Sequence, residues 1–319
     1  MKWFSAVRGR VLISALLLAM GLWGLWTPDL PTAQLLQRHG VPGQQVLEVD
    51  GLRISYQDTG PSQAPALILL HGFGSSLQTW NAWVPVLSRD YRVIRLDLPG
   101  FGLTGARSDR DYSEDRDLST LRHLADRLGL RSFSVIGHSM GGKMAWSLAA
   151  AEPERVKALV LMAPDGLASP AQWGTKPYEV SGVMHLIEYT LPRPLVRQFV
   201  GAAFTDPQLL TEPLVQRYHD MLRAPGVRGA ILDRAHQTVY SNPLSRLQSI
   251  HAPTLLLWGG NDRMIPSSHA ASYEQLLPRS KTVVLPQLGH VLQEEQPEQG
   301  LAQVQAFLNA HVLNPLPAQ

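Results

Sequence analysis

Short strand-like runs alternate with helix-like stretches along most of this 319-residue chain. Two alternating runs, 46–49 and 52–56, flank Asp50-Gly51 and predict a β-hairpin. Further strands are predicted at 66–70, 91–98, 133–136, 156–162, 254–258 and 281–285. Apolar residues at helical spacing predict helices at 75–87, 113–128, 143–151, 267–277 and 301–312. Such alternation predicts an α/β fold with a mostly parallel, doubly wound sheet of about eight strands.

The alternation stops between residues 167 and 250, where helix-compatible segments are interrupted by repeated prolines and no strand-like run occurs. We therefore expect a helical lid inserted after the sixth strand, between core segments at 46–166 and 251–319. Aromatic and sulfur side chains recur in this stretch, and we expect at least one to contact a substrate: Trp173, Tyr178, Met184, Tyr189, Phe199, Phe204, Tyr218 and Met221.

The N-terminal segment differs from the rest of the chain. Lys2, Arg8 and Arg10 precede a run from Val11 to Trp26 whose only non-apolar side chain is Ser14. The run has no polar face, which argues against a buried soluble helix. Tryptophans near its end suit a membrane interface, and no convincing cleavage site follows. We favour a membrane anchor, with a cleaved signal peptide as the alternative.

The anchor or signal segment covers residues 1–28, and a Pro- and Gly-containing linker or interfacial segment is expected at 29–45. Under either export interpretation the basic residues stay in the cytoplasm. The catalytic part would then be periplasmic, tethered to a bacterial-type inner membrane, or secreted if the segment is cleaved.

Composition excludes several classes of function. The chain has no cysteine, which rules out disulfide scaffolds and thiolate nucleophiles. Its formal net charge is only +2, and no dense basic run is present, so nothing indicates a nucleic acid partner. The oligomeric state is not encoded in any pattern that we recognise.

The strand at 133–136 is followed by Gly137-His138-Ser139-Met140-Gly141, which matches the G-x-S-x-G nucleophile elbow. In this motif a sharp strand-to-helix turn exposes the serine hydroxyl. The glycines are needed because side chains would collide where the backbone doubles back. A serine also needs a base, and that base needs an orienting acid.

His290 follows the last predicted strand and is the best candidate for the base, and Asp262 follows the strand before it. Both positions lie at the carboxyl ends of parallel strands, where functional groups of such sheets gather. The order serine, acid, histidine is the order expected with this elbow. Asp165, after the sixth strand, is a rival for the acid.

Residues 46–312 resemble the α/β-hydrolase family, in its capped esterase- and lipase-like branch. The resemblance rests on five motifs in order: His71-Gly72-Phe73-Gly74, Asp97-Leu98-Pro99-Gly100-Phe101-Gly102, the elbow, Gly259-Gly260-Asn261-Asp262 and Gly289-His290. It implies Ser139 as nucleophile, Asp262 as acid and His290 as base. It also implies an oxyanion hole made of the backbone N–H groups of Phe73 and Met140. No metal or organic cofactor is required.

Other polar residues of these motifs have structural interpretations. His138 is expected to be a packed neighbour of the serine, and His71 to brace the oxyanion loop. Asp97 is expected to fix its own loop, and Lys143 to be structural or exposed.

The predicted function is hydrolysis of carboxylic esters of small apolar substrates. A C–C bond hydrolase or a perhydrolase with the same triad is the main alternative. Similar C–C hydrolases carry Asn before the nucleophile and Trp after the catalytic histidine, where this chain has His138 and Val291. A non-catalytic, membrane-tethered binding module is the alternative from another class.

Overall fold

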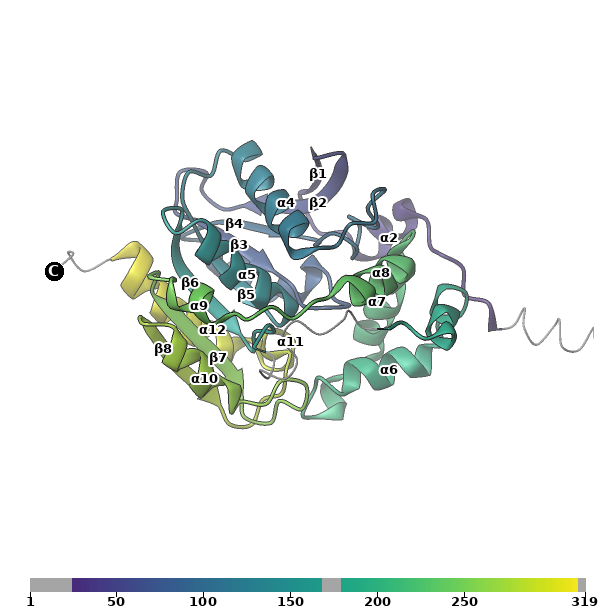
Figure 1. Ribbon diagram of the computed structural model, residues 1–319. Helices are drawn as coiled ribbons and strands as arrows, with labels where there is room; N and C mark the ends of the chain where they lie inside the picture. Colours follow the sequence, from purple (N-terminus) through teal and green to yellow (C-terminus); the bar gives the residue numbers. More distant parts are fainter. Residues whose placement is uncertain (1–24, 168–178, 315–319) are drawn as a thin grey trace, which may run out of the picture.

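The computed structural model describes residues 25–167 and 179–314, which form a layered α/β molecule around one sheet (Figure 1). The sheet has eight strands in the order β1-β2-β4-β3-β5-β6-β7-β8. Their bounds are β1 Gln44–Val49, β2 Leu52–Thr59, β3 Ala66–Leu70, β4 Arg92–Leu96, β5 Phe133–His138, β6 Val156–Met162, β7 Thr254–Gly259 and β8 Ser280–Leu285. This confirms the predicted mostly parallel sheet.

Pairing in the sheet follows the connections between strands. β1 and β2 form the predicted antiparallel hairpin, and β2 also pairs antiparallel with β4. The remaining pairs, from β4 through β3 and β5 to β8, are parallel. Parallel neighbours need long crossovers, and helices supply them.

Helices cover both faces of the sheet. The bounds of the core helices are η1 Leu77–Trp80, α3 Val84–Leu87, α4 Glu114–Arg127, α5 Met140–Ala151, α10 His269–Leu276, α11 Leu292–Glu295, α12 Pro297–Leu308 and the π-helical turn η5 Asn309–Leu313. Successive side chains of β3 show the two layers: Ile68 and Leu70 pack with α4 and α5, whereas Leu67 and Leu69 pack with α3 and α12. A strand buried on both faces must be apolar at every position, which explains its continuous run.

The helix predicted at 75–87 is two short pieces, η1 and α3. Pro85 explains the break, because it has no N–H to donate and its ring would clash with the carbonyl of Asn81. The Asn81 side chain instead accepts a hydrogen bond from buried Arg95 at 2.6 Å.

Residues 179–250, here called the helical insertion, lie between β6 and β7. They contain η3 Gly182–Glu188, α6 Arg193–Gly201, η4 Pro207–Leu209, α7 Glu212–Leu222, α8 Val227–Gln237 and α9 Leu244–Gln248. α6 and α7 pack around a small core of their own that includes Val200, Phe204 and Tyr218. Two of the aromatic residues that we considered as substrate contacts, Phe204 and Tyr218, thus pack inside the insertion. Trp173 and Tyr178 lie outside the described residues.

The stretch expected to be a linker contains a helix, α2 Thr32–His39, packed beside α7 (Figure 1). Pro31 and Gly40, which we read as linker signals, bound this helix on either side. Leu35 is fully buried, and the buried carboxylate of Asp220 accepts hydrogen bonds from Arg38 and His39 at 3.2 and 2.9 Å. The expectation of a linker was wrong because these partners lie about 180 residues away in sequence.

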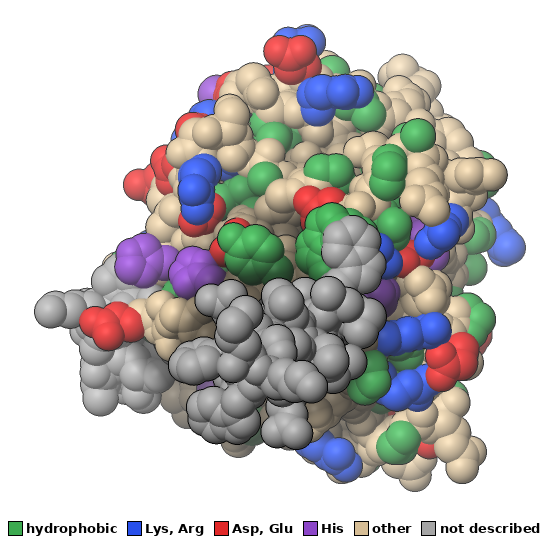
Figure 2. Space-filling model, turned by 90° about the vertical axis from the view of Figure 1, so that its right-hand side faces the viewer, with side chains coloured by type: hydrophobic (Ala, Val, Ile, Leu, Met, Phe, Trp, Pro, Cys, Tyr) green, Lys and Arg blue, Asp and Glu red, His purple; other side chains and the backbone are tan. Residues whose placement is uncertain are grey.

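The proposed anchor, residues 1–28, lies outside the described residues except for its last four positions. Within 25–167 and 179–314, no helix is long and apolar enough to span a membrane. On the face shown in Figure 2, acidic, basic and hydrophobic side chains are interspersed and no broad basic patch stands out.

Substitution of Gly141 by Ala tests the closeness of the elbow to the sheet. An added Cβ would lie 2.5 Å from the carbonyl oxygen of His71 and closer still to that of Leu70. Because backbone atoms cannot give way easily, G141A should lower the free energy of unfolding by about 3 kcal/mol. G182A is the control, since an added Cβ there meets nothing within 4 Å. Chemical denaturation that gives both variants wild-type stability would contradict this packing.

Candidate active site

Ser139 lies at the turn between β5 and α5, in a backbone conformation that residues other than glycine rarely adopt. Its φ and ψ are 53° and −118°. Such a conformation costs ~1–3 kcal/mol and persists only when its surroundings enforce it. Here the Ser139 N–H donates to the Met162 carbonyl at 2.9 Å, and the Ser139 carbonyl accepts from the N–H groups of Lys143 and Asp165 at 3.1 and 3.0 Å. β6 and α5 together therefore hold the elbow.

The glycines of the elbow are required by close backbone contact. An added Cβ on Gly137 would collide with the carbonyl of Gly141. An added Cβ on Gly72, in the preceding loop, would lie 2.8 Å from Nδ1 of His138 and 3.2 Å from Cβ of Ser139. The elbow and the loop after β3 thus touch with no space for a side chain.

Asp262 and His290 lie at the carboxyl ends of β7 and β8, as expected, and they meet in space. Nδ1 of His290 is 2.7 Å from Oδ2 of Asp262. The second oxygen of Asp262 accepts the N–H groups of Met264 and Ile265 at 2.8 and 2.9 Å. Because an ionised carboxylate only accepts, Nδ1 carries the hydrogen and Nε2 keeps the lone pair that a base needs. Both side chains are almost fully buried.

The elbow and the histidine loop are in contact through two imidazole rings. The ring centroids of His138 and His290 are 4.6 Å apart, and Nε2 of His138 donates to the His290 carbonyl at 2.9 Å. Across the described chain, no hydrogen bond joins the Ser139 hydroxyl to His290. Such serine–histidine bonds are commonly long until substrate aligns them.

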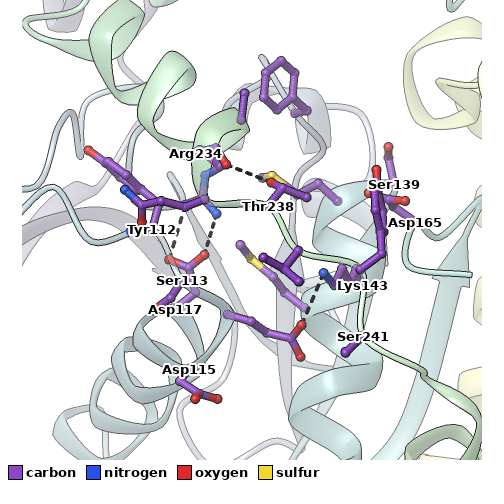
Figure 3. A pocket seen from close by; sticks show the side chains of 18 of the residues that line it. Tyr112, Ser113, Asp115, Asp117, Ser139, Lys143, Asp165, Arg234, Thr238 and Ser241 are labelled. Atoms are coloured by element: carbon purple, nitrogen blue, oxygen red, sulfur yellow. Dashed lines mark hydrogen bonds and ion pairs between the residues drawn. The ribbon is translucent and has the colours of Figure 1, made fainter. Parts of the chain in front are cut away.

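Asp165 lies beside Ser139 at the cavity wall (Figure 3) but engages other partners. One of its carboxylate oxygens accepts the Gly166 N–H at 2.7 Å. Its backbone carbonyl accepts from the Trp146 indole and the Tyr273 hydroxyl at 3.1 and 2.8 Å. The geometry thus pairs His290 with Asp262 and not with this rival.

The two candidate oxyanion donors are the N–H groups of Phe73 and Met140. Among the described residues, neither N–H group donates a hydrogen bond to a backbone carbonyl in a turn, loop or helix cap. His71 braces the loop that carries Phe73: its Nδ1–H donates to the Gly72 carbonyl at 2.8 Å, and its Nε2 accepts the Leu98 N–H at 2.9 Å. Burial lowers the pKa of His71 to about 4, so the ring is neutral and can accept at Nε2.

Asp97 fixes the neighbouring loop, as its structural interpretation predicted. Its carboxylate accepts the N–H groups of Leu77 and Leu103 at 2.7 and 2.8 Å. Burial raises its pKa to about 6, against the opposing effect of these hydrogen bonds. The side chain is fully buried and does not line the cavity.

His138 is a packed neighbour of the nucleophile with one unused ring nitrogen. Burial, and then the charge of His290, hold the pKa of His138 well below its usual value. The ring is therefore neutral, with the hydrogen on Nε2, and its Nδ1 has no hydrogen-bond partner in the part of the chain that the structure describes. A neutral ring here avoids repulsion when His290 takes up a proton.

A cavity of about 730 Å³ opens beside Ser139 (Figure 3). Phe73, Met140 and Met144 give it an apolar part, and charged pairs give it a polar part. These pairs are Arg234–Asp117 at 2.6 Å and Lys143–Glu114 at 3.3 Å.

The lining bears on two sequence-based expectations. Lys143, expected to be structural or exposed, is part of the cavity wall one helical turn beyond the nucleophile. The described insertion contributes residues 234–235 and 237–241 and Arg246 to the wall, and none of the aromatic residues singled out from the sequence. The helical periodicity of α8 gave no signal that its carboxyl end would face a cavity.

The choice of acid is tested by comparing two carboxylate-to-amide substitutions. D262N should lower kcat for an aryl ester about 10⁴-fold, because an amide no longer holds His290 in the tautomer that leaves Nε2 free. D165N should lower it far less, since this side chain has no hydrogen bond to His290. The reverse order of effects would move the acid to Asp165.

Comparisons with known proteins identify the family and the fold. The family described as the alpha/beta hydrolase fold matches residues 65–297. The chain is 31% identical over 261 residues to 2-hydroxy-6-oxononadienedioate/2-hydroxy-6-oxononatrienedioate hydrolase 2 of Pseudomonas putida, covering 77% of this chain and 88% of the relative.

Two solved structures are similar over most of their length. One is a membrane phospholipase A described as a bacterial virulence factor, with 29% identity, a TM-score of 0.72, and coverage of 99% of this chain and 100% of that chain. The other is a putative lipase from Acinetobacter baumannii AYE, with 25% identity, a TM-score of 0.74, and coverage of 91% and 99%. The chain belongs to the alpha/beta hydrolase family.

Proposed function

We propose that this protein is a serine hydrolase that cleaves carboxylic esters through an acyl-enzyme. The observation that carries the proposal is the His290–Asp262 pair at 2.7 Å beside a strained elbow whose Ser139 is half-buried at the cavity wall. The N–H groups of Phe73 and Met140, which have no hydrogen-bond partner among residues 25–167 and 179–314, complete the parts that acyl transfer needs.

The reaction then has two halves. Ser139 Oγ attacks the ester carbonyl while Nε2 of His290 takes its proton, and the oxyanion is stabilised by the N–H groups of Phe73 and Met140. His290 donates the proton to the leaving alcohol. Water, deprotonated by His290, next attacks the acyl-enzyme, and Ser139 recovers its proton as the acid departs.

The cavity favours an amphiphilic ester over a wholly apolar one. Phe73, Met140 and Met144 suit a hydrocarbon chain, whereas Lys143 and Arg234 belong to ion pairs at the same wall. Burying only hydrocarbon against these pairs would cost desolvation without new hydrogen bonds. The resemblance to a membrane phospholipase A supports esters of lipid-like shape.

C–C bond hydrolysis is the second candidate, and the Pseudomonas putida relative favours it. Against it, His138 occupies the position before the nucleophile, where similar C–C hydrolases carry Asn, and its imidazole donates to the His290 carbonyl. Val291, where those enzymes carry Trp, packs into the core of the helical insertion.

Replacement of Ser139 by Ala should lower ester turnover at least ~10³-fold, because the nucleophile is lost. The assay is a panel of aryl and glycerol esters of increasing acyl length, with a ring-fission dienoate alongside. A fluorophosphonate probe should label the wild type and leave S139A unlabelled. Undiminished turnover by S139A, or a wild type that is not labelled, would contradict the proposal. A wild type that is neither labelled nor active would favour the alternative of a non-catalytic binding module. A dienoate cleaved with higher kcat/KM than every ester would establish the second candidate. Perhydrolysis is tested in the same assay by adding peroxide and measuring peracid formation.

We also propose that residues 1–28 anchor the protein in a membrane, with the catalytic part on the periplasmic side. The apolar run after three basic residues supports this, as does a likeness to a membrane phospholipase A that extends over 99% of the chain.

The anchor predicts where the protein is found after cell fractionation. The full chain should sediment with membranes and be released by detergent but not by high salt, because an apolar span is held by burial and not by charge. A variant that lacks residues 1–24 and carries a cleavable export signal is the control and should be soluble. A full-length gene product found soluble with a shortened N-terminus would contradict the anchor.

A further inference from the structure

The backbone around the catalytic histidine is held at three points by groups outside the triad. The Gly289 N–H donates to Oε2 of Glu295 at 2.6 Å. The His290 N–H donates to the Ala203 carbonyl at 2.8 Å, and the His290 carbonyl accepts from His138 at 2.9 Å. The position of the imidazole therefore depends on α11 and on the helical insertion as well as on Asp262.

Glu295 links these two elements. It ends α11, five residues after the catalytic histidine, and its side chain is buried, with 5% exposure. While Oε2 binds the histidine loop, Oε1 accepts the N–H groups of Thr205 and Asp206 in the insertion at 2.8 and 3.3 Å. In the described parts of the chain no cationic side chain pairs with it. A buried carboxylate is thus satisfied entirely by backbone donors from two segments.

The junction has no free space. An added Cβ on Gly289 would lie 2.7 Å from the Ala203 carbonyl, 2.9 Å from Oε2 of Glu295 and 3.0 Å from the Thr205 N–H nitrogen. On the other side of His290, Val291 packs into the insertion's own core. The residues flanking the base are therefore both fixed to the insertion, and small displacements of the insertion must carry the loop with them.

We propose that Glu295 is a positioning residue that joins the His290 loop to the helical insertion, so that the insertion sets the alignment of the base. The inference rests on the proposed serine-hydrolase function. Residues 234–235 and 237–241 of the same insertion line the cavity, so the segment that forms part of the cavity wall also holds the base. Glu295 itself touches no reacting atom and does not line the cavity.

The decisive substitution is E295Q, which keeps the shape of the side chain. An amide has one acceptor oxygen, so its NH₂ group must face either the Gly289 N–H or the Thr205 N–H. One of the two tethers is then lost. Misplacement of a catalytic group by about 1 Å costs ~10²-fold in rate, so we expect kcat to fall about 10²-fold with KM little changed.

E298Q is the matched control, because Glu298 is exposed three residues further on and, among the described residues, forms no hydrogen bond or ion pair with the histidine loop. E295D keeps the charge but has a shorter side chain, and its kcat should lie between those of E295Q and the wild type. It also keeps the test open if E295Q folds poorly. Rates are divided by the number of sites titrated with fluorophosphonate, which removes the contribution of misfolded protein.

Two readouts distinguish positioning from a merely structural role. The rate of fluorophosphonate labelling should fall in parallel with kcat, since both need an aligned base. The downfield NMR signal of the His290 Nδ1–H should broaden or shift in E295Q and remain in E298Q. Wild-type kcat per titrated site in E295Q, or an unchanged Nδ1–H signal, would overturn the inference. A wild type that is never labelled would instead refute the proposed function, and the NMR comparison would still decide the role of Glu295.

Discussion

The site depends on one strained turn, in which a serine is held at a φ of 53° between a buried strand and a helix. The five residues of the elbow could not keep the backbone in this conformation by themselves, because an isolated peptide would relax to a conformation of lower energy. The strain persists because the sheet supplies a carbonyl from Met162, α5 and the loop after β6 supply N–H donors, and glycines let the strands, loop and helix approach within backbone contact. The rest of the fold provides these constraints.

The sequence was informative where chemistry follows directly from chain order. Continuous apolar runs predicted the parallel strands, and the residues just after them, Ser139, Asp262 and His290, predicted a common edge of the sheet. The structure places His290 and Asp262 in hydrogen-bond contact there. The structural interpretations of His71 and Asp97 agree with their contacts as well, because buried polar groups beside glycine turns need backbone partners.

Periodicity could not reveal contacts between distant segments. Pro31 and Gly40 look the same in a linker as at the two ends of a docked helix, and contacts with distant residues such as Asp220, on α7, distinguish the two cases. Phe204 and Tyr218 are as apolar in the insertion's own core as they would be in a substrate site. Glu295 gave no signal at all, because a carboxylate in a polar run is normally solvated, and its partners Thr205 and Asp206 are about 90 residues away.

The docking of the segment before α2 has a consequence for how the enzyme would meet a membrane. The Thr27 N–H already bonds to the Tyr189 carbonyl, the Leu30 N–H to the Arg223 carbonyl, and Asp29 to Arg228 at 2.6 Å. No free stretch of chain would therefore separate an anchor that ended at residue 28 from the helical insertion. If residues 1–28 anchor the protein as we propose, the helical insertion that lines the cavity would be the part of the body next to the end of the anchor.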